Sequence, residues 1–343
     1  MRTISANERK RSSVRTFDVW RQQLAESSAP MIGLVLVLVF VFFAIAAPNF
    51  LSFYVLSNVL TFASVYGIVV VGVAFLMISG EFDLSVGSIL AVSGYAFVLS
   101  LLAGIPPFFA FCLTLLAGAV MGLINGTVVV YSGIPSFIAT LGSLLAYRGI
   151  AHGLGKGQAT SYTPAVKPVL FDILNGYIAP LNELADPAGN LRVSSIWFMV
   201  VVAVMSFILM RTRYGNWTFA VGGNPGAALA QGVNLKRVKL FNFVLSGFMA
   251  GLASAVLFAQ RSSMFQLLGE GLELTAVAAC VIGGVALSGG IGTIAGAALG
   301  MLLLSMLEQG LVLMGVPNDI FRGIVGATVI LSVVINMYIT RQE

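Results

Sequence analysis

Residues 211–239 read RTRYGNWTFAVGGNPGAALAQGVNLKRVK, and they form a polar, basic segment inside a chain that is otherwise mostly apolar. No acidic residue balances its basic residues, which are Arg211, Arg213, Lys236, Arg237 and Lys239. Its middle predicts a short helix, with Asn224 as the N-cap, Pro225 in the first turn and Gly232 as the C-terminal stop. Between two membrane spans, such a segment is either a helix that docks onto another protein or a charged loop that only fixes topology.

The composition on both sides of this segment predicts an all-α polytopic membrane protein. The 343 residues are 58% hydrophobic and only 9% charged, whereas soluble domains carry roughly 25% charged residues. A bilayer can accommodate many long apolar runs that one hydrophobic core cannot. The net charge of +5 therefore indicates orientation in the membrane rather than nucleic-acid binding. Cys112 and Cys280 lie in apolar runs and are interpreted as small buried residues.

The apolar runs predict about ten spanning helices in one membrane domain. We place them at residues 31–47, 56–79, 86–103, 108–131, 134–151, 194–210, 240–260, 274–287, 293–314 and 320–338. Residues 1–30 form a basic tail, and residues 31–343 form a single transmembrane domain with a polar segment at 152–193. A signal peptide is the alternative for the first run, but its basic lead-in is too long, and about 17 apolar residues suffice to span.

The charges orient this topology. The basic tail and the basic residues of 211–239 fall on one side, whereas acidic residues such as Asp172, Glu183 and Glu270 fall on the other. Since the cytoplasmic side of a membrane protein carries the excess of Lys and Arg, we expect both termini and residues 211–239 to be cytoplasmic. Residues 152–193 then lie outside.

Glycines at intervals of four indicate an internal repeat. They occur in the fourth span and in the ninth with its lead-in: Gly118, Gly122, Gly126, Gly292, Gly296 and Gly300. Such strips let another backbone approach closely. DLSV at 83–86 and ELTA at 273–276 lie in the same register. Five helices in each half would make an inverted 5+5 repeat, which is common in transporters; the alternative is coincidence among 38 glycines.

Polar residues inside the apolar sequence are candidates for a translocation pathway. They are Glu81, Asp83 and Ser85 at 80–88, Ser136, Phe137 and Thr140 at 135–143, and Glu308 in the ninth span. A carboxylate costs roughly 2.5–3.5 kcal/mol at the centre of a spanning helix, so these acids are expected at a helix break, an interface or a wet cavity. The alternatives are local: Asp83 or Ser85 as helix caps, and the hydroxyl residues as packing contacts.

The signatures of enzymes are missing. The sequence has one histidine, His152, which excludes a His-Glu-x-x-His zinc site. Gly155-Lys156 lacks the glycine and the Ser/Thr of a phosphate-binding loop, and GIGTIA at 290–295 opens a span instead of following a strand. We expect no catalytic residue, metal or cofactor on this chain. If ATP drives it, another chain binds the ATP.

Four stretches resemble, in the same order, the permease subunits of ribose-type ATP-binding-cassette importers. They are GEFDLSVGS at 80–88, IPSFIATLGSLLAYRGIA at 134–151, AVGGNPGAALAQGVNLKRVK at 220–239 and ELTAVAACVIGGVALSGGIGTIAGAALG at 273–300. The resemblance runs from about residue 57 to 338. It implies a bacterial inner-membrane permease that pairs with a second permease copy or a related chain. It also implies a cytoplasmic ATPase with two fused cassettes and a periplasmic binding protein that delivers a monosaccharide or similar polyol.

The resemblance further implies that residues 224–232 are the coupling helix, with Asn224, Ala227, Ala228 and Gly232 carrying the coupling to the ATPase. This sequence departs from the family pattern at Pro225-Gly226 and at Glu308-Gln309-Gly310, which puts in doubt the choice of ATPase and of substrate or partner subunit. Two other functions fit the residues alone. One is an ion-coupled carrier that uses Glu81, Asp83 or Glu308, and the other is a membrane scaffold.

Overall fold

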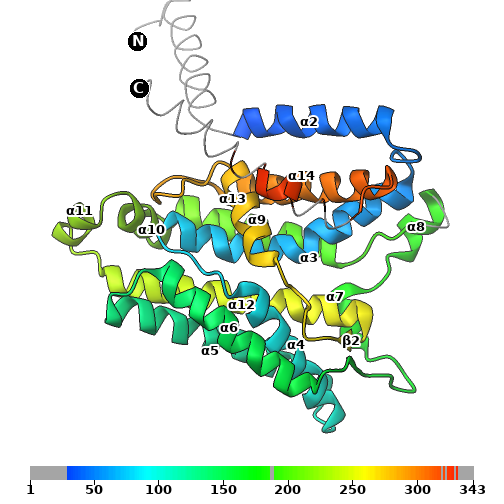
Figure 1. Cartoon of the computed structure of the whole chain (residues 1–343), viewed down its shortest axis with the longest axis horizontal. Coiled ribbons are helices and arrows are strands. Elements are labelled where there is room, and N and C mark those ends of the chain that lie inside the picture. Colours follow the sequence, from blue (N-terminus) through cyan, green and yellow to red (C-terminus); the bar gives the residue numbers. More distant parts are fainter. Residues whose placement is uncertain (1–28, 186–188, 318–319, 321–322, 328–329, 331–343) are drawn as a thin grey trace, which may run out of the picture.

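A computed structural model of the protein describes residues 29–185, 189–317, 320, 323–327 and 330, and these are mostly helical (Figure 1). The long helices are α2 (Ala29–Ala46), α3 (Phe53–Ile78), α4 (Val86–Leu102), α5 (Pro107–Ser132), α6 (Ser136–Gly155), α9 (Ser194–Arg211), α12 (Leu235–Arg261) and α14 (Ile294–Leu313). The shorter helices are α7 (Val169–Asn175), α8 (Ala179–Ala185), α10 (Arg213–Gly223), α11 (Pro225–Ala230) and α13 (Leu272–Ile282). The two-residue strands β1 (Thr160–Ser161) and β2 (Ser263–Met264) pair in antiparallel register.

Each of the first nine predicted spans overlaps a helix, because each is a largely apolar run. Five helices of the described part are long and apolar enough to cross a membrane: α3, α5, α9, α12 and α14. The chain is therefore a polytopic helical membrane protein. The predicted tail at 1–30 and the tenth span at 320–338 lie largely outside the described residues, as do both termini.

The predicted eighth span is shorter in the structure than in the sequence analysis. Helix α13 ends at Ile282, because Gly283 caps it and Gly284 has a φ of +81°. At 1.5 Å per residue, its 11 residues extend about 16 Å, roughly half the hydrocarbon thickness of a bilayer. The prediction of a complete span here was wrong, and α13 is a half-length helix.

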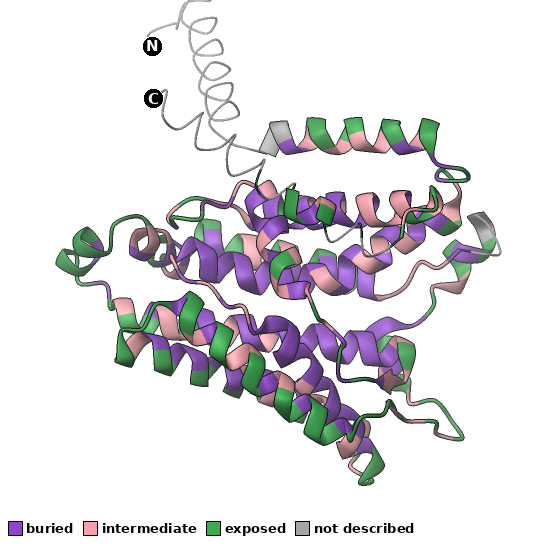
Figure 2. Cartoon of the chain, in the orientation of Figure 1, coloured by how far each residue is buried: buried purple, intermediate pink, exposed green. Residues whose placement is uncertain are grey.

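Helices α3 and α12 form the buried centre of the protein, and the outer helices are half exposed (Figure 2). Helix α5 packs along α12, and α14 packs along α3. The outer faces of α5 and α6 carry large exposed apolar side chains, such as Leu116, Ile124 and Leu145. Lipid or a second protein would cover such faces. Cys112 is exposed on α5, so the expectation that both cysteines are buried holds only for Cys280.

Both glycine strips lie where helices approach closely. A Cβ at Gly118 or Gly122 would lie 2.3 or 2.2 Å from a backbone oxygen of α12. At Gly296 it would lie 2.1 Å from the oxygen of Gly283, and at Gly300 2.1 Å from that of Ala279 on α13. Gly126 meets the Phe243 and Leu240 side chains, and Gly292 meets Val285. The strip of α5 therefore faces α12, whereas the strip of α14 faces α13 and the loop that follows it.

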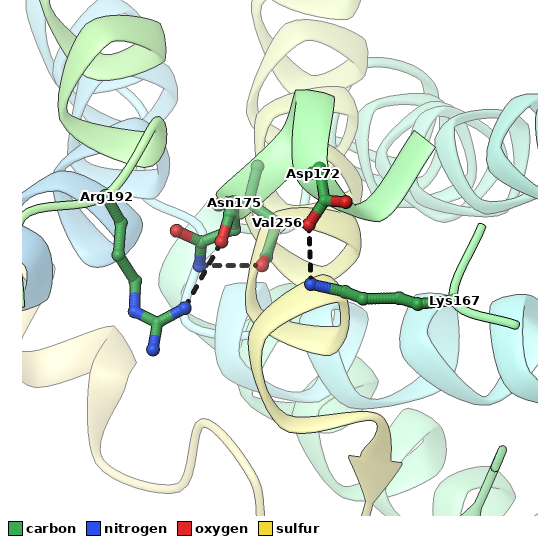
Figure 3. A network of polar contacts seen from close by, with 5 residues as sticks. All are labelled: Lys167, Asp172, Asn175, Arg192 and Val256. Carbon is green, nitrogen blue, oxygen red and sulfur yellow. Dashed lines mark hydrogen bonds and ion pairs between the residues drawn. The ribbon is translucent and has the colours of Figure 1, made fainter. Parts of the chain in front are cut away.

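The polar segment 152–193 folds back onto the ends of the long helices. Phe171 of α7 is buried against Phe97 and Phe258. Asn175 donates to the carbonyl of Val256 at 3.0 Å, and Arg192 donates to the carbonyl of Asn175 at 3.3 Å (Figure 3). Burial lowers the pKa of the Arg192 guanidinium below its usual value. The exposed ion pair of Lys167 and Asp172 adds little stability, since exposed pairs contribute about 0–1 kcal/mol.

Candidate translocation core and coupling loop

The break between α3 and α4 brings two of the predicted polar stretches together. Helix α3 ends at Ile78, and Gly80 turns the chain with a φ of +83°. The amides of Phe82 and Leu84 then donate to Ser136 Oγ at 3.0 Å and Thr140 Oγ1 at 3.1 Å, both on α6. The hydroxyls of α6 thus satisfy backbone donors that the broken helix leaves free. Phe137, between them in sequence, points away and is 55% exposed.

Asp83 lies at the centre of a buried polar network. Its Oδ1 accepts from the amide of Ser85 at 2.9 Å, from Ser85 Oγ at 2.6 Å and from Asn125 Nδ2 at 3.3 Å. Asn125 Nδ2 also donates to Ser85 Oγ at 2.8 Å, and Asn125 Oδ1 accepts from Tyr147 Oη at 3.0 Å. The sequence analysis missed Asn125 and Tyr147. An amide within the apolar run LINGTVVV of α5 was the signal that could have revealed Asn125.

Glu81 connects the same break to the start of α12. Its carboxylate forms an ion pair with Lys239, and the side chains are 10% and 26% exposed, respectively. Lys239 belongs to the basic segment 211–239, one turn after α12 begins at Leu235. The break is therefore tied to α12 by charge and to α6 by hydrogen bonds.

We expect Glu81→Gln and Lys239→Gln each to reduce the free energy of unfolding by about 1–3 kcal/mol, between the values for exposed and buried pairs. The exchanged pair Glu81→Lys with Lys239→Glu should recover at least half of this loss, because it restores the attraction. Thermal melting of the purified protein measures both effects. Arg237→Gln, an exposed neighbour on α12, is the control. Strictly additive effects in the exchanged variant would show that the two charges do not interact.

The short helix predicted in the basic segment is confirmed as α11. Asn224 Oδ1 accepts from the amide of Ala227 at 2.9 Å, and Gly232 ends the turn with a φ of +80°. Ala228 is buried against Val221, Val233 and Val238, so it cannot contact another protein directly. Ala227 and Leu229 face outward instead, and Leu229 is 62% exposed. Helices α10 and α11 lie at one end of the protein, opposite α7 and α8 (Figure 1).

Glycines allow α10 to pack closely against the central helices. A Cβ at Gly222 of α10 would lie 1.9 Å from the carbonyl oxygen of Ile78 and 2.6 Å from the amide nitrogen of Gly290. That amide donates to the same Ile78 carbonyl at 2.8 Å. The end of α10, the end of α3 and the loop before α14 therefore meet backbone to backbone, and no side chain fits at Gly222.

Glu308 lies apart from the Asp83 network. It lines a cavity of about 430 Å³ together with Tyr66, Arg261 and Glu270. Arg261 is the last residue of α12, whose 27 residues extend about 40 Å from the end near α11. Because the Asp83 network lies close to the start of α12 and Glu308 close to its end, the structure divides the predicted pathway residues into two groups.

Comparison with known proteins identifies the family of this chain. A family model described as the permease component of a branched-chain amino acid transport system matches residues 55–333. The chain belongs to this permease family. It is 32% identical over 327 residues to the xylose transport system permease protein of Escherichia coli K12, covering 81% of this chain and 83% of that protein. It is 33% identical over 290 residues to the ribose import permease protein of the same strain, covering 84% and 87%.

A further relative is the autoinducer 2 import system permease protein of Photorhabdus luminescens, 34% identical over 280 residues, with 81% of each chain covered. These relatives confirm the resemblance to permease subunits of ribose-type importers. The protein is a transport subunit and not an enzyme. The family also favours this function over the ion-coupled carrier.

Proposed function

We propose that this chain is the membrane-spanning permease of an ATP-driven importer for a monosaccharide or a small polyhydroxylated solute. The observation that carries the proposal is its similarity, over most of its length, to permeases named for xylose and ribose transport. The protein would lie in a bacterial inner membrane with both termini in the cytoplasm. Its partners would be a double-cassette ATPase, a periplasmic binding protein and a second permease copy or related chain.

We also propose that the membrane domain consists of two inverted halves of five membrane helices each, with the half-length α13 as the eighth helix. If α3 corresponds to α12 and α5 to α14, then the packing of α5 on α12 has its counterpart in the packing of α14 on α3. Likewise, α4 packs on α5 as α13 packs on α14. The halves would differ in detail, since α13 is short and the two glycine strips face different partners. Inverted halves of this kind support alternating access about a pathway between them.

The proposed coupling route begins at α11. Its outward residues, Ala227 and Leu229, would sit in a cleft of the ATPase, while Asn224 and Gly232 fix the two ends of the helix. Ala228 would seat α11 on the body of the permease. Displacement of α11 would reach α3 and the loop before α14 through the close packing at Gly222. It would reach the helix break at 79–85 through Lys239 and Glu81.

Leu229→Glu is expected to weaken capture of the ATPase at least tenfold, because it places a charge on the exposed apolar face of α11 without touching the buried Ala228. Tenfold corresponds to about 1.4 kcal/mol, a modest value for an apolar contact at an interface. Co-purification of the ATPase with the tagged permease measures the effect. Val169→Glu, at a 73% exposed position on α7 at the other end of the protein, is the matched control. Equal ATPase recovery with both variants would remove α11 from the interface.

The function as a whole is tested by purifying the tagged protein from its native membrane and identifying what accompanies it by mass spectrometry. We expect a double-cassette ATPase, and in reconstituted vesicles we expect sugar uptake that requires ATP and the binding protein. Uptake by this chain alone that collapses with an uncoupler would instead establish an ion-coupled carrier.

A further inference from the structure

Two adjoining cavities lie at the end of the protein opposite α11. Their volumes are about 430 and 290 Å³, and they share Phe62, Tyr66 and Arg261 as lining residues. Glu308 lines the larger cavity, and Asn58 and Gln309 line the smaller one. We call this pair of cavities the outer vestibule. Volumes of this order suit a small ligand, since ligand pockets typically measure about 300–1,000 Å³.

Some polar side chains of the outer vestibule are bonded within the protein: Asn58 Oδ1, for example, accepts from Asn190 Nδ2 at 2.7 Å. Others have no partner in the described part of the chain. The side chains of Arg261, Glu308 and Gln309 form no hydrogen bond or ion pair with another described residue. Arg261 is exposed, and Glu308 and Gln309 are half-buried, so water reaches these groups when the cavities are empty. Hydroxyl groups of a ligand can take the place of that water. Arg261 of α12 lines both cavities, whereas Glu308 of α14 lines the larger one and Gln309 of α14 lines the smaller one.

The chemistry of the lining fits a polyol better than an apolar or a singly charged solute. Carboxylate, guanidinium and amide groups are planar and offer two adjacent hydrogen-bonding atoms, which match neighbouring hydroxyl groups on a sugar ring. The rings of Phe62 and Tyr66 offer apolar faces with negative charge density, against which the C–H face of a sugar can pack. A purely apolar solute would offer no hydrogen-bonding partner to the carboxylate and the guanidinium.

The position of the outer vestibule fits entry from outside. In the predicted topology, α11 faces the cytoplasm, so the far end of α12 faces the periplasm. The loop that forms one wall is held in place from α6, since Arg148 donates to the carbonyls of Gln266 and Leu268 at 2.6 and 3.1 Å. β2, which begins this loop, also pairs with β1 of the folded outer segment. The wall is therefore preformed.

We propose that the outer vestibule is a pentose-sized polyol-binding site on the permease itself, where the solute rests after leaving its delivery protein. Phe62 and Tyr66 pack against the ring, and Arg261, Glu308 and Gln309 bind its hydroxyls. The direction of transport in this inference rests on the proposed function. The binding of a free sugar to this chain does not depend on that function.

The test is protection of introduced cysteines in the full-length purified chain. Cys112→Ala removes the exposed native thiol, and Cys280 is buried. Leu267→Cys and Asn58→Cys, at lining positions with no assigned contact to the solute, then report on the outer vestibule. Ser132→Cys, exposed at the far end of α5, is the control. We expect D-xylose or D-ribose to slow alkylation at both vestibule positions about threefold or more and to leave Ser132→Cys unchanged. L-leucine should protect none of the three.

Three results would overturn the inference. The first is the absence of pentose protection, and the second is equal protection by leucine. The third is a pair of vestibule cysteines that never react while Ser132→Cys does. This third result would show that lipid or a second copy of the chain fills the outer vestibule. In the assembled transporter, Glu308→Gln should raise the pentose concentration for half-maximal uptake about tenfold and leave ATPase capture unchanged. Protection in the isolated chain without any uptake by the unmodified transporter would contradict the proposed function but would still support the binding site.

Discussion

Leucine in place of Gly122 is expected to prevent the accumulation of folded protein. The Cβ of any residue there would lie 2.2 Å from the carbonyl oxygen of Phe243 and 3.2 Å from the Cα of Val244. Both atoms are backbone atoms of α12, so no change of rotamer can relieve the clash. Overpacking a core costs about 1–3 kcal/mol and occasionally more, and here α5 and α12 would have to separate along their length.

The matched control is Gly142→Leu on α6, where no atom lies within 4 Å of an added Cβ. Both variants place the same side chain in a helix of the same apolar chain, so membrane insertion and helix propensity are nearly equal. Size-exclusion chromatography and thermal melting in detergent should show a folded Gly142→Leu protein and an aggregated or strongly destabilised Gly122→Leu protein. Equal melting temperatures would contradict the close approach of α5 and α12.

Local signals in the sequence predicted local structure well. The ends of α11 follow from residues within a few positions of each other, because a cap and a left-handed glycine act on the adjacent turn. The apolar runs located the long helices to within a few residues, because the apolar character of a run is also a local property of the sequence. The error at α13 arose because composition does not reveal where a helix stops when glycines such as Gly283 and Gly284 are themselves compatible with an apolar run.

Contacts between distant segments could not be predicted from one sequence. Ser136 and Thr140 were recognised as polar residues, but their bonds to Phe82 and Leu84 depend on how α6 lies against the break. The pairing of Glu81 with Lys239 joins segments that are 158 residues apart. The inward orientation of Ala228 was also hidden, because a helix of six residues is too short to show a periodic apolar face.

Asn125→Ala is expected to produce the second large effect, on transport as well as on stability. The change removes the Asn125 donor to Asp83 and to Ser85, and it removes one of the two acceptors of Tyr147 Oη, the other being the carbonyl of Met121. Asp83 is fully buried, and leaving a buried polar group unsatisfied costs about 1–3 kcal/mol, and more for a charged group. The bonds from Ser85 remain, so the protein should fold while the break at 79–85 loses its connection to α5.

We therefore expect Asn125→Ala to lower sugar uptake per folded transporter at least tenfold, with a clear loss of melting temperature. Thr127→Ala is the control on the same helix, since Thr127 is exposed and bonds only to the carbonyl of Leu123. Adding Asp83→Ala to Asn125→Ala should restore part of the melting temperature, because it removes the buried carboxylate whose Oδ2 has lost its donor, but it should not restore uptake. If uptake returned together with stability, the network would only hold the fold together. If uptake stayed lost in the restabilised double variant, transport would depend on how the break at 79–85 is held in place and not only on stability. The proposed coupling route through α12, Lys239 and Glu81 requires this result.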